Sequence, residues 1–270
     1  MIDYQRFIES RFKIVKKKER RDDFSQVVPF KLNSIQDKFL NNNYTDTPII
    51  LKARQQGFSS LIEAILTTDF ILEENSWGLI VADIDENAIG LLDRVKFFIQ
   101  SYEENTKCKV PLKYNTRFEL FNPLMNSRLQ IGTAKNVELG RSKTLTSLHL
   151  SEVAFYPNIE KIFRGAAQAV TEGGRKILET TANGFNEFKK IWEDAKRGDS
   201  IYKPLFYKAS DFYTPQFLAN KKIELKEAYP QEYPENDLEC FLSTGDCYFE
   251  KNVLKQYLNK AEKPIGMFRE

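Results

Sequence analysis

From residue 48 onward, short apolar runs alternate with longer stretches in which apolar residues recur at helical spacing. The run 48–53 (PIILKA) is typical of a buried strand, and a helical pattern follows from Ser59 to about Glu74. The same order repeats, with a strand predicted over 78–84 and a helix over 85–104. This alternation predicts βα units around a largely parallel sheet, which is an α/β fold.

The second half of this pattern is less regular. Residues 117–134 alternate around the turn-like NPLMNS, which predicts a hairpin inserted in the sheet. Two further strands are predicted over 146–152 and 175–184, with the segment 158–170 between them. Past about residue 210 the chain is charged and helical in pattern. We therefore predict a core over 1–210 with a basic N-terminal arm, and a small helical lid or linker subdomain over 211–270.

Composition narrows the class of protein. With 270 residues, of which 41% are apolar, the chain can form a substantial core. No apolar run approaches the length of a membrane span, and the charged N-terminus is unlike a signal peptide. The three cysteines show no metal-binding spacing, and the single histidine, His149, cannot complete a zinc site. A reducing, intracellular setting is expected.

Charge is unevenly distributed. The net charge is only +2, but residues 11–24 hold seven Lys or Arg against three Asp or Glu. A basic arm of this kind can neutralise nucleic-acid phosphates, although a charged run is also typical of a solvated helix face.

The segment 51–60 (LKARQQGFSS) resembles a phosphate-binding loop that lacks its lysine. The usual pattern is Gly, four residues, Gly, Lys, then Ser or Thr. Gly57 and Ser59 occupy their places, but Phe58 stands at the lysine position. Backbone amides at a helix N-terminus can still bind phosphate without the lysine. Another cation must then stabilise the charge that develops as the γ phosphate leaves. Lys52 and Arg54 are both candidates for that cation.

Two other predicted strands end in polar residues. Glu152 follows an apolar strand, as does the carboxylate that activates water in P-loop ATPases, but Ser151 replaces the aspartate that usually precedes it. The segment 179–185 (ETTANGF) places Thr180, Thr181 and Asn183 at the end of another strand. Each tip also fits an ordinary capped or glycine-terminated strand. Together they favour a ligand site, because all three fall on one edge of the sheet.

An ordered set of motifs extends this interpretation. It consists of FKLNSIQDKFL, KARQQGFSS, LGRSKTLTSLHLSEVAFYP, ETTANGF and YPENDLECFLSTGD, and it covers roughly residues 28–250. The set resembles the ATPase domain of the large terminase subunit, the DNA-packaging motor of tailed double-stranded DNA viruses. The resemblance implies a P-loop fold of the RecA/ASCE type, with ATP and Mg²⁺ as cofactors.

The resemblance also implies roles for single residues. Glu152 is expected to be the catalytic carboxylate and Arg141 to reach the nucleotide of a neighbouring subunit. Lys52 or Arg54 is expected to replace the loop lysine. Ser59, with Ser60 as the alternative, and Ser151 through a water, are expected to hold Mg²⁺. Thr180, Thr181 and Asn183 are expected to couple hydrolysis to movement. The expected nucleotide-binding residues are Gln36, which would read adenine, and the loop residues Gln55, Gln56, Gly57, Phe58, Ser59 and Ser60.

The same resemblance implies a homo-oligomeric ring on a portal protein, with the small terminase subunit and double-stranded DNA as partners, in the host cell cytoplasm. The free chain is expected to be monomeric. We expect no nuclease domain, because only Glu250, Glu262 and Glu270 follow residue 249 among the acidic residues. The alternatives are a helicase-like, DNA-dependent ATPase and a degenerate nucleotide-binding module that does not hydrolyse ATP.

Overall fold

The computed structural model describes residues 2–16, 24–136 and 138–242. In this part of the chain, eight strands form one sheet in the order β10-β3-β9-β8-β4-β7-β6-β5. The six strands from β10 to β7 are parallel, and β6 and β5 continue the sheet in antiparallel pairing. The strands span Pro48–Lys52 (β3), Trp77–Ala82 (β4), Tyr114–Asn115 (β5), Glu119–Asn122 (β6), Ser127–Thr133 (β7), Leu145–Ser151 (β8), Val170–Thr180 (β9) and Lys203–Tyr207 (β10).

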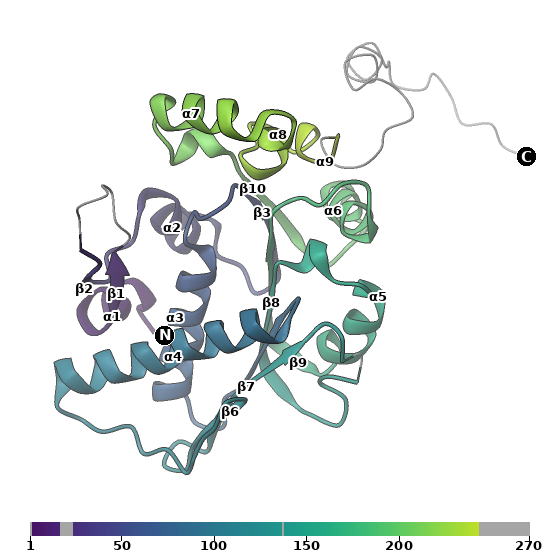
Figure 1. The fold of residues 1–270 in the computed structure, drawn as a ribbon. Coiled ribbons are helices and arrows are strands. Elements are labelled where there is room, and N and C mark those ends of the chain that lie inside the picture. Colours follow the sequence, from purple (N-terminus) through teal and green to yellow (C-terminus); the bar gives the residue numbers. More distant parts are fainter. Residues whose placement is uncertain (1, 17–23, 137, 243–270) are drawn as a thin grey trace, which may run out of the picture.

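Helices cover both faces of this sheet (Figure 1). One face carries α1 (Tyr4–Arg11), α2 (Ser34–Lys38), α3 (Phe58–Leu72) and α4 (Asp85–Thr106). The other carries α5 (Ile159–Ile162) and α6 (Glu187–Arg197). Helices α7 (Pro215–Leu225), α8 (Tyr229–Glu232) and α9 (Glu239–Leu242) lie beyond one end of the strands (Figure 1). The α/β class and the mainly parallel sheet are confirmed.

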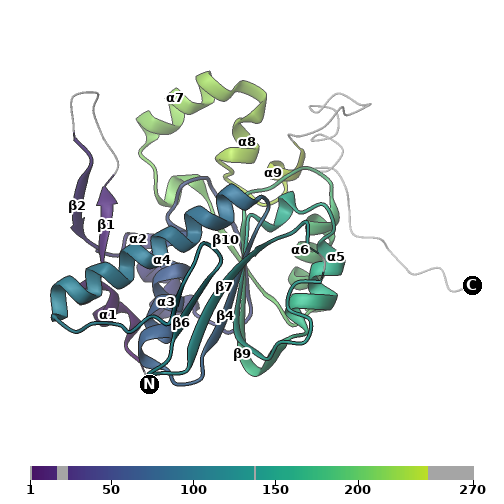
Figure 2. The ribbon, with the colours of Figure 1, turned by 60° about the horizontal axis from the view of Figure 1, so that its bottom comes forward.

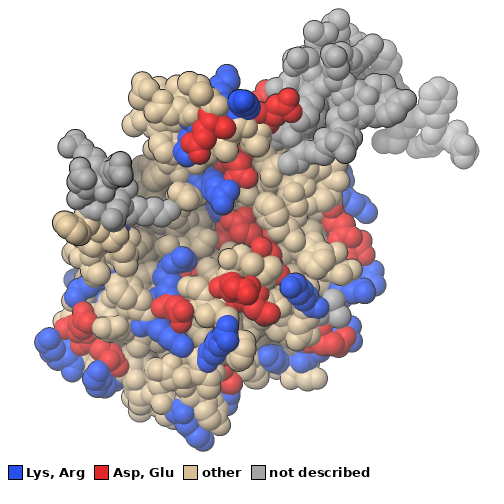
Figure 3. Space-filling model, in the orientation of Figure 1, with Lys and Arg blue, Asp and Glu red and all other residues tan. Residues whose placement is uncertain are grey.

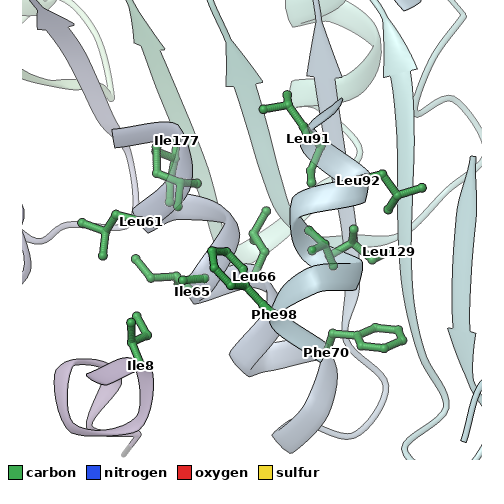
Figure 4. Packing of buried hydrophobic residues seen from close by; sticks show 14 of the residues in the cluster. Ile8, Leu61, Ile65, Leu66, Phe70, Leu91, Leu92, Phe98, Leu129 and Ile177 are labelled. Carbon is green, nitrogen blue, oxygen red and sulfur yellow. The ribbon is translucent and has the colours of Figure 1, made fainter. Parts of the chain in front are cut away.

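The core between the sheet and α1–α4 depends on α3. Twelve of its fifteen residues are buried, eight of them apolar, as expected for a helix that packs within a core. Figure 4 shows α3 side chains such as Leu66 and Phe70 among those of α4 and the strands, with Ile8 of α1 on the outer side. The N-terminus of α3 is therefore held firmly at the edge of the sheet.

Several elements were not predicted. The N-terminal segment forms α1 and a two-stranded antiparallel sheet of β1 (Lys13–Lys16) and β2 (Gln26–Pro29), which stands apart from the main sheet in Figure 2. Strand β10 and helix α6 were also missed, and β9 begins at Val170 and ends at Thr180 rather than covering 175–184. The middle of the basic arm, residues 17–23, lies outside the described residues.

Short helices complete the chain. A π-helical turn, Phe39–Asn43, follows α2, and a second, Phe163–Ala167, follows α5. Three 3₁₀ turns lie at Val153–Phe155, Ala209–Asp211 and Lys226–Ala228. The predicted helical character past residue 210 holds through α9, and a small aromatic cluster forms there around Tyr233. The domain boundary at 210 stays a prediction, and residues 243–270 lie outside the described residues.

The loop that carries Arg141 requires glycine at position 140. Gly140 has φ +83°, and a Cβ there would come within 2.6 Å of the Ala166 Cα. Gly173 has a similar φ of +77°, but no atom lies within 4 Å of its would-be Cβ. A substitution at Gly173 therefore tests backbone strain alone, and one at Gly140 tests backbone strain together with steric overlap.

We expect Gly173→Ala to lower the free energy of unfolding by about 1 to 2 kcal/mol, the cost of a left-handed backbone. Gly140→Ala should lose a further ~1 to 3 kcal/mol, because the added methyl group meets backbone that cannot move aside cheaply. Urea unfolding of both variants measures the difference. Equal losses would contradict the close approach of this loop to Ala166.

Candidate active site

Two side chains at the start of α2 donate hydrogen bonds to the loop between β3 and α3. The Gln36 side chain donates to the Gly57 carbonyl at 2.8 Å, and the Asn33 side chain donates to the Gln56 carbonyl at 3.1 Å. Gln36 also closes a capping box with Asn33 at the start of α2. Both amide atoms of Gln36 are thus engaged within the chain, and its expected contact with adenine stays a prediction.

Gly57 turns the loop into the helix. It has φ 85° and is the N-cap residue of α3, where no side chain caps the first amides. A left-handed conformation is favourable for glycine and costly for most other residues. The uncapped N–H groups at the start of a fifteen-residue helix form a favourable environment for an anion such as phosphate.

Phe58 is directed into the core. It is 1% exposed, and its ring packs against Tyr207 and Phe39 at centroid distances of 4.7 and 5.7 Å. A lysine with this orientation would bury an ammonium among aromatic rings, at a high desolvation cost. A cation for bound phosphate must therefore come from a different position.

Lys52, the last residue of β3, is 4% exposed and lies at the centre of the site. Its Nζ is 3.1 Å from Glu152 Oε1 and 2.9 Å from Glu179 Oε2. Burial by itself lowers the pKa of this ammonium, but the attraction of Glu152 and Glu179 outweighs burial and raises the pKa above its ordinary value. Lys52 is therefore charged at neutral pH.

Glu152 is held in a strained backbone conformation just beyond β8, with φ 55°. Its Oε2 accepts from the Thr181 backbone N–H at 3.1 Å and from the Thr180 hydroxyl at 3.4 Å. Strain of this kind persists only where the surroundings fix it, and it is frequent at functional sites. The adjacent strand tip thus positions the carboxylate that the sequence predicts to be catalytic.

Glu179 was not among the predicted site residues, yet it joins the other groups. It is fully buried, and its Oε1 accepts from the hydroxyls of Ser59, at 2.8 Å, and Ser151, at 2.7 Å. Burial opposes ionisation of this carboxyl, but Lys52, and then His149 and Ser151, outweigh it and hold the pKa below its ordinary value. A single carboxylate inside the apolar strand KILETT was the signal available in the sequence.

Arg54 lines the same cavity as Lys52, but its contacts are with the helical region. Its side chain is 60% exposed and pairs with Glu232 at 3.1 Å. Its backbone N–H donates to the Glu232 carbonyl at 2.9 Å, and its carbonyl accepts from the Tyr213 hydroxyl at 2.6 Å. The Gln56 side chain adds a bond to the Lys208 carbonyl at 3.0 Å. The two cations considered from the sequence therefore have different surroundings.

The other predicted residues lie nearby or on the surface. Asn183 donates to the Ala154 carbonyl at 3.2 Å and so ties the tip of β9 to the turn after Glu152. Arg141 lies in an exposed turn and pairs with Glu138 at 3.0 Å. Its side chain is 60% exposed. Its action on a neighbouring subunit stays a prediction.

A cavity of about 1240 Å³ opens beside the loop. It is lined by the loop, by residues of β1, β2 and α4, and by Lys52 and Glu152. Arg94 of α4 also lines it and pairs with the buried Glu63 at 2.6 Å. The cavity is large enough for a nucleotide-sized ligand.

The oxygen atoms around Ser59 and Lys52 suit a hard cation. Ser59 and Ser151 offer hydroxyls, and Glu152 and Glu179 offer carboxylates, which are the donors Mg²⁺ prefers. Among the described residues there is no cluster of three or more His, Cys, Asp or Glu able to hold a metal by itself. Magnesium that is bound chiefly through substrate phosphates and waters fits such a donor set.

Similar solved structures share this arrangement of strands. The ATPase domain of the Thermus phage P74-26 large terminase aligns with 76% of the chain and 93% of its own length, at 15% identity and a TM-score of 0.61. The fold is that of a large-terminase ATPase domain. The HK97 bacteriophage large terminase aligns with 95% of the chain, at 19% identity and a TM-score of 0.60. The large terminase of another thermophilic bacteriophage, solved in complex with ADP, aligns with 75% of the chain at 14% identity and a TM-score of 0.56.

The terminase fold extends over most of this chain, which spans 50% of the length of the HK97 protein and 52% of the ADP-bound terminase. No protein-family model and no curated protein matches the sequence. At these identities the solved structures establish the fold, which confirms the resemblance noted from the motifs at that level. No helix in the described ranges is both long and apolar enough to cross a bilayer.

Lys52 should be required for stability as well as for any chemistry. We expect Lys52→Met to lower the free energy of unfolding by about 3 kcal/mol or more at pH 7, because Glu152 and Glu179 lose their counter-charge. Arg54→Met, which removes an exposed pair, should cost about 1 kcal/mol or less. Denaturant unfolding of the two variants beside wild type measures both losses.

The Lys52→Met loss should depend on pH. In the wild type the pKa of Glu179 is lowered by folding, which stabilises the fold at pH values above 4.5, the ordinary pKa of this carboxyl. This contribution is lost as the pH falls below 4.5 toward the lowered pKa. In the variant, buried Glu179 lacks a cation, so its charge destabilises the fold at neutral pH. The difference between the two proteins should therefore be greatest near pH 7 and shrink toward pH 4. A difference that does not vary with pH would contradict the ion pairing.

Proposed function

We propose that this chain is the ATPase motor domain of a viral large terminase, which hydrolyses ATP to move double-stranded DNA into a procapsid. The observation that carries the proposal is the position of Lys52, with its Nζ 3.1 Å from Glu152 beside an uncapped helix N-terminus. A phosphate on that helix terminus would meet the ammonium and the carboxylate together. Phosphoryl transfer requires both, a cation for developing charge and a carboxylate for the attacking water.

In this proposal each group of the site has one task. The amides of Gly57 and Ser59 bind phosphate. Lys52 rather than Arg54 is the principal cation for it, since Lys52 pairs with Glu152, the proposed catalytic carboxylate, whereas Arg54 pairs with Glu232 of the helical region. Glu152 orients the attacking water. Ser59 would hold Mg²⁺ directly and the other oxygens of the site would hold it through waters. The metal would neutralise charge on the phosphates. A thermophilic-phage large terminase of the same fold was solved with ADP and with ATP-γ-S.

Coupling to movement follows from the contacts of Arg54. The loop that follows Lys52 is joined through Arg54 to Glu232 and Tyr213 of the helical region. A loop that changes on loss of phosphate would therefore pull on α7 and α8. Thr180 and Thr181, which hold Glu152, would transmit the same change to β9.

The motor context implies several partners. We propose a homo-oligomeric ring on a portal protein, with the small terminase subunit and double-stranded DNA, in which Arg141 of one subunit stabilises charge at the next subunit's nucleotide. Positive and negative side chains are interleaved on the face in Figure 3. Because the described residues on this face form no basic patch of their own, we propose that the surface that contacts DNA forms only when the ring assembles.

Two alternatives have distinct signatures. A helicase-like ATPase would separate the strands of a forked duplex. A degenerate module would bind ATP and release no phosphate, and the replacement of the loop lysine by Phe58 is its main support.

Phosphate release from Mg·ATP tests the proposal. The rate per subunit should rise with protein concentration, because Arg141 acts between subunits, and it should vanish in Glu152→Gln. ADP binding should survive that substitution, since Glu152 acts on water. Absence of phosphate release above the Glu152→Gln background at any concentration, with portal and DNA present, would favour the degenerate module.

Mixing two inactive variants tests the role of Arg141. Arg141→Ala has an intact site and no donor arginine, whereas Glu152→Gln has the arginine and no working site. An equimolar mixture should hydrolyse ATP faster than either variant alone, because mixed interfaces restore one complete site. Arg164→Ala, which removes an arginine that is 79% exposed, is the matched control and should hydrolyse ATP like wild type. A mixture no faster than its components would exclude action across the interface.

A further inference from the structure

One residue of the site has no task in the proposal above, and that residue is Glu179. It is fully buried on the central strand β9, and the hydroxyls of Ser59 and Ser151 both donate to its Oε1. A buried carboxylate without a compensating interaction is rare in folded proteins, because desolvation of the charge is expensive. Lys52 compensates the charge, but it does not explain why two hydroxyls converge on one oxygen.

Strand register places Glu179 beside Ser151. Strands β8 and β9 are parallel neighbours, and Ser151 pairs directly with Glu179. Their side chains therefore point to the same face of the sheet, about 4.8 Å apart in the backbone. On the other side β9 pairs with β3, where Ile50 is opposite Glu179. Glu179 is thus one strand closer to the phosphate-binding loop than Ser151 is.

The position of Ser151 is where P-loop ATPases usually carry the aspartate that holds Mg²⁺. A serine there leaves the metal without its usual negative partner on β8. Glu179 provides a carboxylate next to that serine, and it accepts a hydrogen bond from Ser59, the loop hydroxyl expected to bind the metal.

We propose, building on the ATPase function above, that Glu179 replaces the missing aspartate: the metal-holding carboxylate of this site comes from β9 instead of β8. Ser151 is then a positioning residue, because its hydroxyl fixes Glu179 Oε1 at 2.7 Å. Compared with the usual site, the carboxylate lies one strand over, on β9, and its oxygen still lies beside the Ser59 hydroxyl. Glu179 orients Ser59 and the metal's waters, and Glu152 remains the carboxylate for the attacking water.

Calorimetric titration with ADP, in Mg²⁺ and in EDTA, tests this assignment without relying on hydrolysis. The ratio of the two dissociation constants reports metal binding and cancels general effects on the nucleotide site. In Glu179→Gln, the factor by which Mg²⁺ strengthens ADP binding should fall about tenfold or more. This is the usual effect of losing a group that supports a metal ligand. Asp69→Asn, which changes another buried carboxylate near the C-terminal end of α3, whose partner is Arg175, should keep the wild-type ratio.

An exchange variant makes the test specific. Ser151→Asp combined with Glu179→Ser returns the carboxylate to β8, and we expect it to recover most of the Mg²⁺ effect that Glu179→Gln loses. Ser151→Asp alone places two carboxylates together and should not improve on wild type. Glu179→Asp retains the charge for Lys52 but draws it back from Ser59, so it should fold well and still lose Mg²⁺ tightening. Mn²⁺ bound with ADP gives the same comparison by its electron paramagnetic resonance signal.

The outcomes distinguish failure of the proposed ATPase function from failure of the role assigned to Glu179. Wild type that binds neither ADP nor ATP, with or without metal, would refute the proposed function and this assignment with it. Wild type that shows the Mg²⁺ effect while Glu179→Gln and Glu179→Asp keep the full ratio would refute the assignment alone. An equal loss of ADP affinity in Mg²⁺ and in EDTA would also refute it, since Glu179 would then only shape the loop.

Discussion

The buried ammonium of Lys52 is the interaction on which the site depends. Its Nζ lies 3.1 Å from Glu152, which follows β8, and 2.9 Å from Glu179 on β9, and Lys52 itself ends β3. Buried ion pairs add little net stability compared with apolar packing, but loss of one partner is costly. The arrangement therefore penalises any register of β3, β9 and β8 that separates the three charges. It favours one alignment of the strands at the edge where a phosphate would bind, and the same charges that specify the alignment are the ones proposed for chemistry.

The predictability of the fold followed the depth of burial. Strands β3 and β4 are nearly continuous apolar runs because both faces are covered, and such runs can be recognised without a structure. Strand β10 was missed, since it contains a proline at the sheet edge and only its last residue is buried. The start of β9 was hidden by Gly173 and Gly174 and by an exposed stretch. The N-terminal elements have short patterns whose packing partners lie far along the chain, so local sequence does not determine them.

The sequence could single out candidate site residues where each lies at the end of a strand, as Lys52, Glu152 and Thr180 do. Their convergence is seen in the contacts of Glu152 with the other two. Glu179 escaped prediction because its importance depends on the register that sets it opposite Ser151, which no linear motif encodes. The departures Phe58 and Ser151, treated from the sequence as weaknesses, have separate physical accounts. Phe58 fills the core, and Ser151 hydrogen-bonds to a carboxylate supplied by the next strand.

The short loop after β3 connects two environments of opposite character. Lys52 is buried and bonded to site carboxylates, whereas Arg54, two residues later, is exposed and bonded to Glu232 of the helical region. Phosphate arriving at Lys52 would compete with Glu152 and Glu179 for the ammonium, so the balance of charge at the strand ends would change with the state of the nucleotide. Because Arg54 is tied through its backbone as well as its side chain, a shift of the loop reaches α8 without requiring the exposed ion pair to be strong. The proposed motor function would need such a link between a charge change and a rigid element, and the loop after β3 is short enough to provide it.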